Sequence, residues 1–334
     1  MGPGCSSSRS VSQTGRLDCL GWLKIAVRSD PETPPTQVHE DLRPLLFSIA
    51  YGIVGSVSEA EDIVQEAFLR FHREQREDAH INSPRAWLST VTTRLAINQV
   101  RSARARRETY VGTWLPEPLL TDPAPDASHH VEMADSLSMA LLVLLETLSP
   151  VERAVFLLRE VFEYGYDEIA AIVGKSEANC RQIALRARRQ VEARKPRFEA
   201  SRRRREELAR RFLEAVDQGD TEGLIGLLAA DVVAYTDGGG KTQTFTRPVY
   251  GRDRIARLLP GFGTWLELLG AEEMRFAEVN GQPGALFLGH DGRAVLVVSF
   301  DIADGLVQAI RAITNPEKLR HLDPMARRPG PLAR

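Results

Sequence analysis

Apolar positions recur at helical spacing through the first two thirds of the chain and at strand spacing in the last third. The helical spacing begins near Asp41 and is regular from Ser58 to Glu74, where apolar residues follow an i, i+3, i+4, i+7 order. That order gives a helix one face to bury. Ser58 followed by Glu61 is a capping-box pair, which predicts that this helix begins at Ser58.

A polar loop is expected from Glu74 to Asn82, after which Ser83 and Pro84 supply a cap and a first-turn proline for another helix. This helix is apolar in its early turns and basic in its late turns. Four prolines then interrupt regular structure and predict a linker with some stiffness: Pro116, Pro118, Pro123 and Pro125.

A second helical unit is expected from Val131 to about Arg204. Ser149 and Glu152 form another capping box, and Gly174 suits the left-handed turn that ends a short helix. The next helix has one stripe to bury, made of Cys180, Ile183, Ala184, Ala187 and Val191. Helix, glycine turn and helix in this order predict a helix-turn-helix.

Beyond Arg205 the apolar pattern changes to helices followed by alternating runs. Turn pairs separate the alternating runs at Asn280-Gly281, Asp291-Gly292 and Asp304-Gly305. This pattern predicts a curved antiparallel sheet with helices packed on it, which is an α+β domain.

Length and charge add two constraints. The chain has 334 residues, which is enough for two or three domains, and 43% of them are hydrophobic. Its net charge of −2 conceals six arginines and no acidic residue from Arg85 to Arg107, and thirteen Lys/Arg against five Asp/Glu from Glu177 to Arg211. Basic segments in a near-neutral chain indicate that particular faces bind a polyanion.

The three cysteines are odd in number and scattered, which favours a reduced, cytoplasmic protein without a disulfide framework. No apolar run is long enough to span a bilayer, so we expect no membrane association. His129 and His130 have no third ligand nearby, so neither a metal site nor any other cofactor is expected.

The helix after Gly174 places Gln182, Leu185, Arg186 and Arg189 opposite its apolar stripe. In a helix-turn-helix the second helix enters the major groove of DNA. Arginine can bond guanine, glutamine can bond adenine, and an apolar side chain can contact a thymine methyl. The face is therefore predicted to read bases; the alternative is a solvated face on which Leu185 packs against a neighbouring domain.

On these motifs, residues 39–195 resemble an extracytoplasmic-function (ECF) sigma factor, a subunit that directs bacterial RNA polymerase to promoters. The resemblance implies a sigma domain 2 that docks on core RNA polymerase and melts the −10 element. It also implies a sigma domain 4 that reads the −35 element of promoter DNA. The implied sites are Asp62, Gln65, Glu66 and Arg70 for core polymerase, Trp87, Arg94, Asn98, Arg101 and Arg104 for the −10 element, and Arg181, Gln182, Leu185, Arg186, Arg188 and Arg189 for the −35 element.

Two of these assignments have competing interpretations. The face around Asp62 is also typical of an ordinary solvated helix. Trp87 shares an apolar stripe with Val91 and Leu95, which favours a core role over a stacking platform for an unpaired base.

Three short segments narrow the resemblance to ECF sigma factors with a SnoaL-like C-terminal extension, which belongs to the cone-shaped NTF2-like fold. They are TWLPEP at Thr113–Pro118, DGGGK at Asp237–Lys241 and NPEKL at Asn315–Leu319. We expect an intramolecular regulatory interface between this extension, sigma domain 2 and the linker, formed by Trp114, Leu115, Pro116, Glu117, Pro118, Asp237, Gly238, Gly239, Gly240, Lys241, Asn315, Pro316, Glu317, Lys318 and Leu319. The linker is expected to thread through core polymerase in one state and to dock on the extension in another.

The sequence therefore predicts a multidomain chain: two all-α sigma domains, the second with a helix-turn-helix, plus a C-terminal α+β NTF2-like cone. Its segments are a disordered extension (1–36), sigma domain 2 (37–108), a proline-rich linker (109–131), sigma domain 4 (132–200), the SnoaL-like domain (205–322) and a disordered tail (323–334).

The predicted function is transcription initiation with core RNA polymerase at promoter DNA, modulated in cis by the SnoaL-like domain. A small ligand for this domain is left open, because NTF2-like cones often enclose a cavity. No catalytic residue is predicted, although Asp237 as a base is a minor alternative. The alternative functions are a ligand-sensing helix-turn-helix regulator and a cyclase- or isomerase-like enzyme with DNA-binding appendages.

Overall fold

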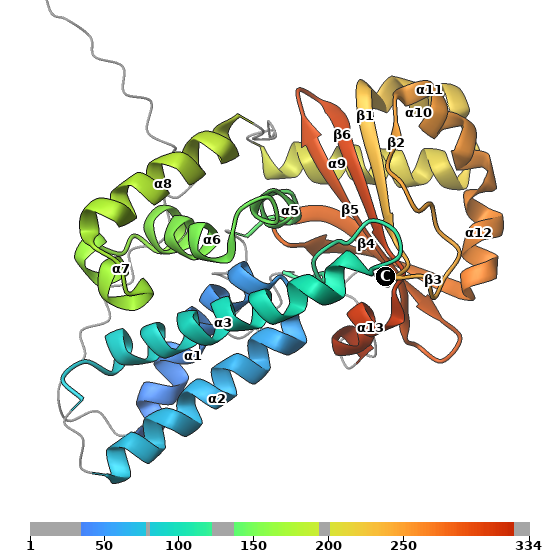
Figure 1. Ribbon diagram of the computed structural model, residues 1–334. Helices are drawn as coiled ribbons and strands as arrows, with labels where there is room; N and C mark the ends of the chain where they lie inside the picture. Colours follow the sequence, from blue (N-terminus) through green and yellow to red (C-terminus); the bar gives the residue numbers. More distant parts are fainter. Residues whose placement is uncertain (1–34, 78–80, 122–136, 194–200, 324–334) are drawn as a thin grey trace, which may run out of the picture. The chain divides into compact units, whose positions relative to one another are not determined.

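The computed structural model describes residues 35–77, 81–121, 137–193 and 201–323 (Figure 1). The described part before residue 194 is built mainly from helices, and the part after residue 200 packs helices on a six-stranded sheet. The predicted order of folds, helical units followed by an α+β domain, is confirmed. Among the described helices, none is long and apolar enough to cross a bilayer.

The first helical unit contains α1 (Pro35–Val54), α2 (Val57–Arg76) and α3 (Pro84–Glu108). The predicted stripe of α2 is buried: Ala60, Ile63, Val64, Ala67, Phe68 and Phe71. Its predicted start is wrong, because the N-cap is Ser56, whose hydroxyl accepts a hydrogen bond from the Glu59 amide at 3.2 Å. The predicted loop at 74–82 is also too long, because α2 continues to Arg76.

The proposed N-terminal extension, 1–36, overlaps α1 at its last two residues, and its remainder lies outside the described residues. The proposed tail, 323–334, is described only at Asp323. His129, His130, Pro123 and Pro125 also lie outside the described residues.

The second helical unit contains α5 (Met139–Leu145), α6 (Pro150–Phe156), the π-helical turn η2 (Leu157–Val161), α7 (Tyr166–Val173) and α8 (Glu177–Glu192). The capping box of Ser149 and Glu152 is present at the start of α6. Gly174 ends α7 with φ 67°, a left-handed conformation that glycine adopts without steric cost. The helix-turn-helix predicted from the sequence is therefore formed by α7 and α8.

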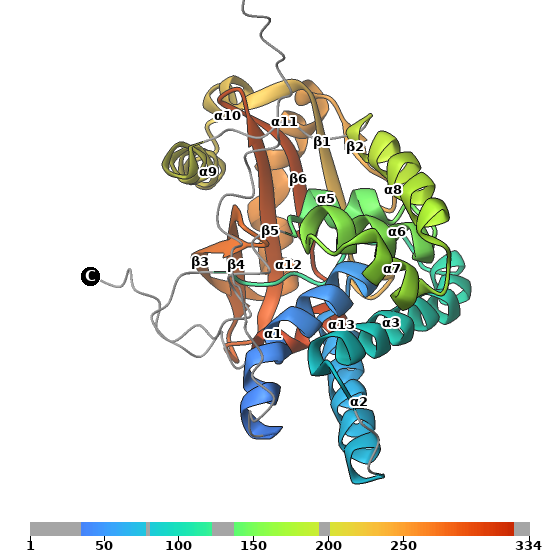
Figure 2. The same cartoon turned by 90° about the vertical axis from the view of Figure 1, so that its left-hand side faces the viewer.

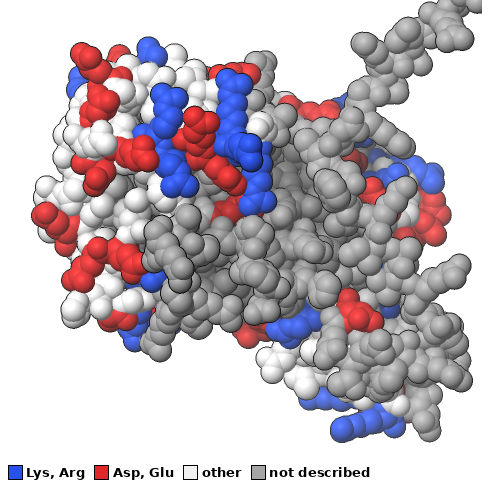
Figure 3. Space-filling view, turned by 180° about the vertical axis from the view of Figure 1, so that it is seen from behind, with Lys and Arg blue, Asp and Glu red and all other residues white. Residues whose placement is uncertain are grey.

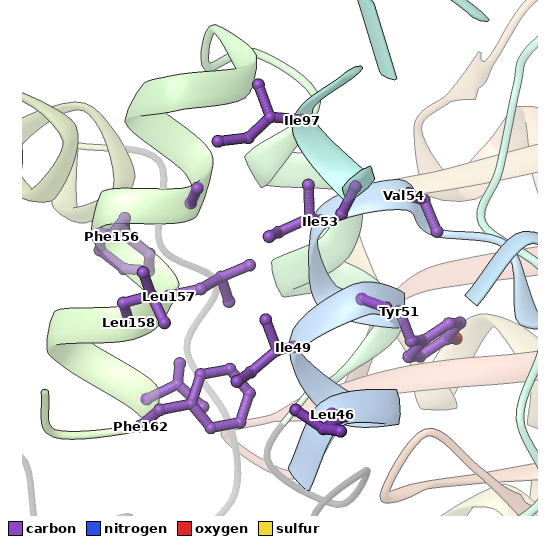
Figure 4. Close-up of a cluster of buried hydrophobic side chains, with 14 of the residues drawn as sticks. Leu46, Ile49, Tyr51, Ile53, Val54, Ile97, Phe156, Leu157, Leu158 and Phe162 are labelled. Atoms are coloured by element: carbon purple, nitrogen blue, oxygen red, sulfur yellow. The ribbon is translucent and has the colours of Figure 1, made fainter. Parts of the chain in front are cut away.

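The two helical units share one hydrophobic core. Ile49 and Ile53 of α1 lie beside Phe156 of α6, Leu157 of η2 and Phe162, which follows η2 (Figure 4). Gly52 permits this approach, because a Cβ at that position would lie 3.0 Å from Leu157 Cδ1. A glycine that weakens an isolated helix here allows close packing with another helix.

The sheet contains β1 (Leu228–Asp237), β2 (Val249–Tyr250), β3 (Ala271–Val279), β4 (Gln282–Gly289), β5 (Ala294–Ala303) and β6 (Leu306–Ile313). Its order is β2-β1-β6-β5-β4-β3, with β1 parallel to β6 and the remaining pairs antiparallel. Asn280 and Asp304 take positive φ values of 51° and 53° in two-residue hairpin turns, each followed by a glycine. The turn predictions at these two positions are confirmed.

Both faces of the sheet are covered. On one face lie α9 (Arg202–Asp217), α10 (Thr221–Leu227), α11 (Arg252–Leu258), η3 (Leu259–Gly261) and α12 (Phe262–Leu269), with a core that includes Phe212, Phe287 and Phe300 (Figures 1 and 2). On the other face lie α13 (Pro316–Leu319), η4 (Arg320–Leu322) and the linker residues Leu115 and Leu120. The charge run at 202–205 is the first turn of α9, so this helix begins before the boundary at 205 drawn from sequence.

Candidate nucleic-acid interface and interdomain contacts

The outward face of α8 is exposed, while its opposite face is buried. Cys180, Ile183, Ala184, Ala187 and Val191 form the buried stripe as predicted, and Ser176 caps the helix by accepting from the Asn179 amide. Gln182, Leu185, Arg186 and Arg189 are exposed, and half of the Leu185 surface is accessible. The outward face of α8 is thus accessible for contact with a DNA groove. No described neighbour buries Leu185.

Two other residues assigned to the −35 element are engaged in ion pairs. Arg181 bonds Glu177 at 2.7 Å and lies over the Tyr166 ring. Arg188 pairs with Glu192 at 3.1 Å and with Glu160 at 3.6 Å. In a complex with DNA, phosphates would compete with these carboxylates for the two flanking arginines.

The residues assigned to the −10 element are spread along α3. Trp87 is half-buried and packs against Phe71 with ring centroids 5.6 Å apart, which supports the core interpretation. Asn98 and Arg101 are exposed, and Arg104 lies on α3 without a described side chain.

Arg94 makes contacts that the sequence did not indicate. Its Nε donates to the Ile172 carbonyl at 2.9 Å, and its Nη2 donates to the Ala171 carbonyl at 3.0 Å. These carbonyls belong to the last turn of α7, where the helix dipole attracts a cation. Arg94, which was expected to contact the −10 element, is therefore bound to the helix-turn-helix unit.

Two further polar contacts join the helical units. Arg153 is 2% exposed and donates to the Ile53 carbonyl at 2.7 Å as well as to the Glu146 carboxylate at 2.6 Å. The hydroxyls of Ser89 and Tyr164 lie 2.7 Å apart in a buried hydrogen bond. Buried polar groups keep such partners because losing one leaves the other unsatisfied.

The face of α2 assigned to core polymerase is exposed at Asp62, Gln65 and Arg70, and half-buried at Glu66. Arg70 Nε bonds Glu66 Oε1 at 2.7 Å, an ordinary (i, i+4) surface pair. Leu69, 46% exposed beside them, was not singled out from sequence. An apolar residue within a polar face is a candidate centre for a docking surface.

Asp237, the first residue of DGGGK, is fully buried among hydrogen-bond donors. Lys318 Nζ and the Leu115 amide each donate to its Oδ2 at 2.7 Å, and Tyr110 donates to its Oδ1 at 2.5 Å. Burial and the hydrogen bond to Asp237 raise the pKa of Tyr110, so the phenol stays protonated and keeps donating. Asp237 thus has the surroundings of a structural hub, and Tyr110 is the member that sequence reasoning missed.

The three predicted segments meet around this hub. Lys318 of NPEKL lies 4.3 Å from the Trp114 ring centroid and also donates to the Leu115 carbonyl. A Cβ on Gly239, whose φ is 58°, would lie 2.3 Å from Asn315 Nδ2, so DGGGK needs glycine there. At the surface, Lys241 pairs with Glu317 and lowers the pKa of that carboxyl.

Glu117 of the linker binds the first turn of α2. Its carboxylate accepts from the Val57 amide at 2.7 Å and from the Ser56 hydroxyl at 2.8 Å, and its backbone amide donates to the Gly55 carbonyl at 2.9 Å. A carboxylate in this position satisfies unpaired amides and complements the helix dipole. On its other side His321 lies 3.9 Å from the same carboxylate and 2.7 Å from the Pro118 carbonyl oxygen.

Asn280, at the β3–β4 turn, connects four segments. Its Oδ1 accepts from the Leu119 amide, and its Nδ2 donates to the Tyr51 hydroxyl at 2.8 Å and to the Leu137 carbonyl at 3.1 Å. Tyr51 in turn donates to the Glu117 carbonyl at 2.8 Å. The linker, α1 and the residues before α5 are thereby joined to one turn of the sheet. Pro116 and Pro118 are buried in the same region, whereas Pro316 is exposed.

Gly238 is buried beside Thr242, and Gly240 is exposed with φ 72°. Leu319 is buried in the cluster that also contains Leu115. Among the residues that the structure describes, no group of three or more His, Cys, Asp or Glu side chains is arranged to hold a metal ion.

Two family models match the chain: sigma-70 region 2 at residues 38–106 and sigma-70 region 4 at residues 138–191. The ECF RNA polymerase sigma factor SigJ of Mycobacterium tuberculosis H37Rv is 38% identical over 307 residues, covering 88% of this chain and 96% of the relative. A probable ECF RNA polymerase sigma factor SigI of M. tuberculosis CDC 1551 is 31% identical over 294 residues, covering 87% and 95%. A crystal structure of M. tuberculosis SigJ matches with a TM-score of 0.69 at 35% identity, covering 85% of this chain and 98% of that one.

Proposed function

Because the chain belongs to the ECF RNA polymerase sigma factors, a family of promoter-recognising transcription initiation factors, we propose that its C-terminal domain controls initiation in cis by holding the DNA-binding units closed. The observation that carries the proposal is the set of hydrogen bonds made by Asn280, which ties the sheet domain to α1, the linker and the residues before α5. In the same arrangement, Arg94 of the predicted −10 surface is bound to α7 carbonyls. The two bonds hold the Arg94 guanidinium against α7 and use its Nε and Nη2, so it presents its full fork of donors to a DNA phosphate only when α7 moves away. The packed arrangement of the two helical units therefore competes with binding of promoter DNA.

The contacts of the linker support the same proposal. The segment from Tyr110 to Thr121 bonds the sheet domain at Asp237, Asn280 and Glu278, and bonds α2 through Glu117. A linker held in this way is unavailable to thread through core polymerase. Opening would release the linker, free Arg94 from the α7 carbonyls and let the two helical units reach separate promoter elements.

In the open state, each helical unit makes a different set of contacts with polymerase or promoter DNA. The α2 face with Asp62, Gln65, Glu66, Leu69 and Arg70 docks on core polymerase through charge-assisted contacts around an apolar centre. The α3 surface with Arg94, Asn98, Arg101 and Arg104 binds the −10 region, and the outward face of α8 reads the −35 element. We propose these residue roles together with the domain limits predicted from the sequence. We also propose that the protein acts in the cytoplasm.

Run-off transcription with core RNA polymerase tests the proposal. Removal of residues 207–334 and the variant Asn280→Gly should both raise initiation at a fixed sigma concentration, because each removes contacts that hold the linker. Glycine keeps the left-handed backbone at position 280, where φ is 51°, and removes only the side-chain bonds. Asp304→Gly, at the equivalent position of another hairpin, is the matched control and should leave initiation unchanged. Unchanged output from both altered chains would reject control in cis.

A further inference from the structure

A cleft of about 400 Å³ lies at the start of α11. It is lined by Ala230, Tyr250, Gly251, Arg252, Asp253, Arg254 and Arg257. Gly251, with φ 89°, makes the turn from β2 into α11 and donates to the Val232 carbonyl at 2.9 Å. The turn brings three arginines and one aspartate to one opening; we call it the α11 cleft.

The arginines of the α11 cleft lack acidic partners. Arg252, Arg254 and Arg257 form no ion pair with any described residue, and Arg257 Nε donates only to the Asp253 carbonyl. The Nε of Arg252 is buried without a hydrogen-bond partner among the described residues. Arg254 and Arg257 are exposed, so their guanidinium groups are accessible to an anion in the cleft.

The arginines of α9 are arranged differently. Lys and Arg side chains alternate with Asp and Glu over the face that carries this helix (Figure 3). Arg202 of α9 forms ion pairs with Glu206 of the same helix and with Glu278 of β3. Alternating signs are typical of a solvated helix face, whereas the α11 cleft carries an uncompensated excess of positive charge.

An aromatic ring stands at the rim of the α11 cleft. Tyr250 lines the cleft and is 58% exposed although it belongs to a strand. Exposed aromatic rings beside arginines provide a stacking platform for a base and donors for its phosphate. The cleft volume lies in the range of small-molecule sites.

We propose that the α11 cleft binds a nucleotide, with Arg252, Arg254 and Arg257 holding its phosphates and Tyr250 stacking on its base. Two ligands present during transcription initiation contain such a nucleotide: free nucleoside triphosphates and the unpaired strand of melted DNA. Both present the same chemistry to the cleft. This inference is independent of control in cis, because it involves none of the linker contacts.

The experiment measures fluorescence anisotropy of two probes with the full-length chain at low salt: mant-ATP and fluorescein-labelled dT12. The variant Arg254→Ala/Arg257→Ala should weaken at least one probe about tenfold or more, because it removes charge-assisted hydrogen bonds. The matched control is Arg203→Ala/Arg211→Ala on α9, which makes the same charge change at exposed positions and should bind like the parent. Loss of mant-ATP binding identifies free nucleotides as the ligand, and a selective loss of dT12 binding identifies the unpaired strand.

The aromatic contact is tested separately. Tyr250→Ala should weaken the probe that binds by about tenfold, whereas Tyr250→Phe should leave it unchanged. Pyrophosphate should displace the probe equally from parent and Tyr250→Ala, because the arginines remain. Circular dichroism melting of each variant establishes that the domain is folded. Equal affinities of the parent and the Arg254→Ala/Arg257→Ala variant for both probes, or no binding of either probe, would overturn the proposal.

Discussion

The interaction between Asp237 and Lys318 shows how one residue pair organises the C-terminal domain. Both side chains are more than nine-tenths buried, and their remaining partners come from the linker. Such a pair gains little over an apolar pair, but breaking it leaves one charge buried alone. The pair therefore ties the position of the linker to the stability of the domain.

Lys318→Met should destabilise the chain by about 3–5 kcal/mol, because Asp237 loses its countercharge inside the protein. Chemical denaturation followed by circular dichroism measures the change. Lys241→Met removes the exposed pair with Glu317 and should cost less than about 1 kcal/mol. Adding Asp237→Asn to Lys318→Met should recover part of the loss. A Lys318→Met loss no larger than that of Lys241→Met would contradict the role of the buried pair.

His321 should make stability depend on pH. Burial lowers its pKa below the usual 6.5, although the Pro118 carbonyl, Glu117 and Asp323 act in the opposite direction. The unfolded chain therefore binds this proton more readily than the folded chain. The stability contributed by neutral His321 is present above pH 6.5 and is lost as the pH falls through the folded-state value.

Melting curves between pH 7.5 and 5 test this dependence. His321→Gln should flatten the decline in stability over that range, whereas His290→Gln, at a side chain that is 91% exposed, should not. Parallel declines in the parent and His321→Gln would show that another group is responsible.

The limits of sequence reasoning are visible in single residues. The sequence marked Asp237 and Lys318 as parts of short motifs but could not pair them, because they are 81 positions apart. Tyr110 was not singled out at all, since a tyrosine in a linker carries no periodic signal. Its two partners, Asp237 and Asn315, come from distant segments. Contacts of this kind are decided by tertiary packing rather than by local pattern.

At the scale of elements, local patterns predicted more. The stripe of α8, the capping box of α6 and the left-handed Gly174 all follow from spacing and residue type within a few positions. The start of α2 was wrong because two serines compete for the cap. The linker decides between them, since Glu117 binds the amides of Val57 and Ser58 and fixes the turn around Ser56. A residue 60 positions away thus sets a helix start.

The outward face of α8 provides an element-scale prediction. Arg186→Ala should cost about 1–3 kcal/mol of discrimination at a single −35 base pair, because arginine can bond two acceptors of a guanine. Arg188→Ala should instead weaken all promoters about equally, as expected for a phosphate contact. Competition binding across single-base −35 variants measures both effects. An unchanged ranking and affinity in Arg186→Ala would mean that this face does not read bases.

At the scale of the whole molecule, the described domains form a closed arrangement. The helical units share a core and three buried or half-buried polar contacts, made by Arg153, Ser89 and Arg94. The sheet domain adds the linker contacts around Asp237 and Asn280. The sequence predicted each domain by type, but their mutual packing has no periodic signature. Under the proposed control in cis, promoter engagement exchanges part of this packing for contacts with polymerase and DNA.

The distance between α2 and α8 tests this exchange most directly. Arg73→Cys and Ala178→Cys introduce two exposed sites for spin labels on a chain whose native cysteines are replaced by serine. Double electron–electron resonance then measures the distance between the labels with and without core RNA polymerase. We expect one short distance in the free chain and a much longer one with polymerase and promoter DNA. Asn280→Gly should populate the longer distance before polymerase is added. The same short distance in the free chain and in an actively initiating complex would contradict the central claim.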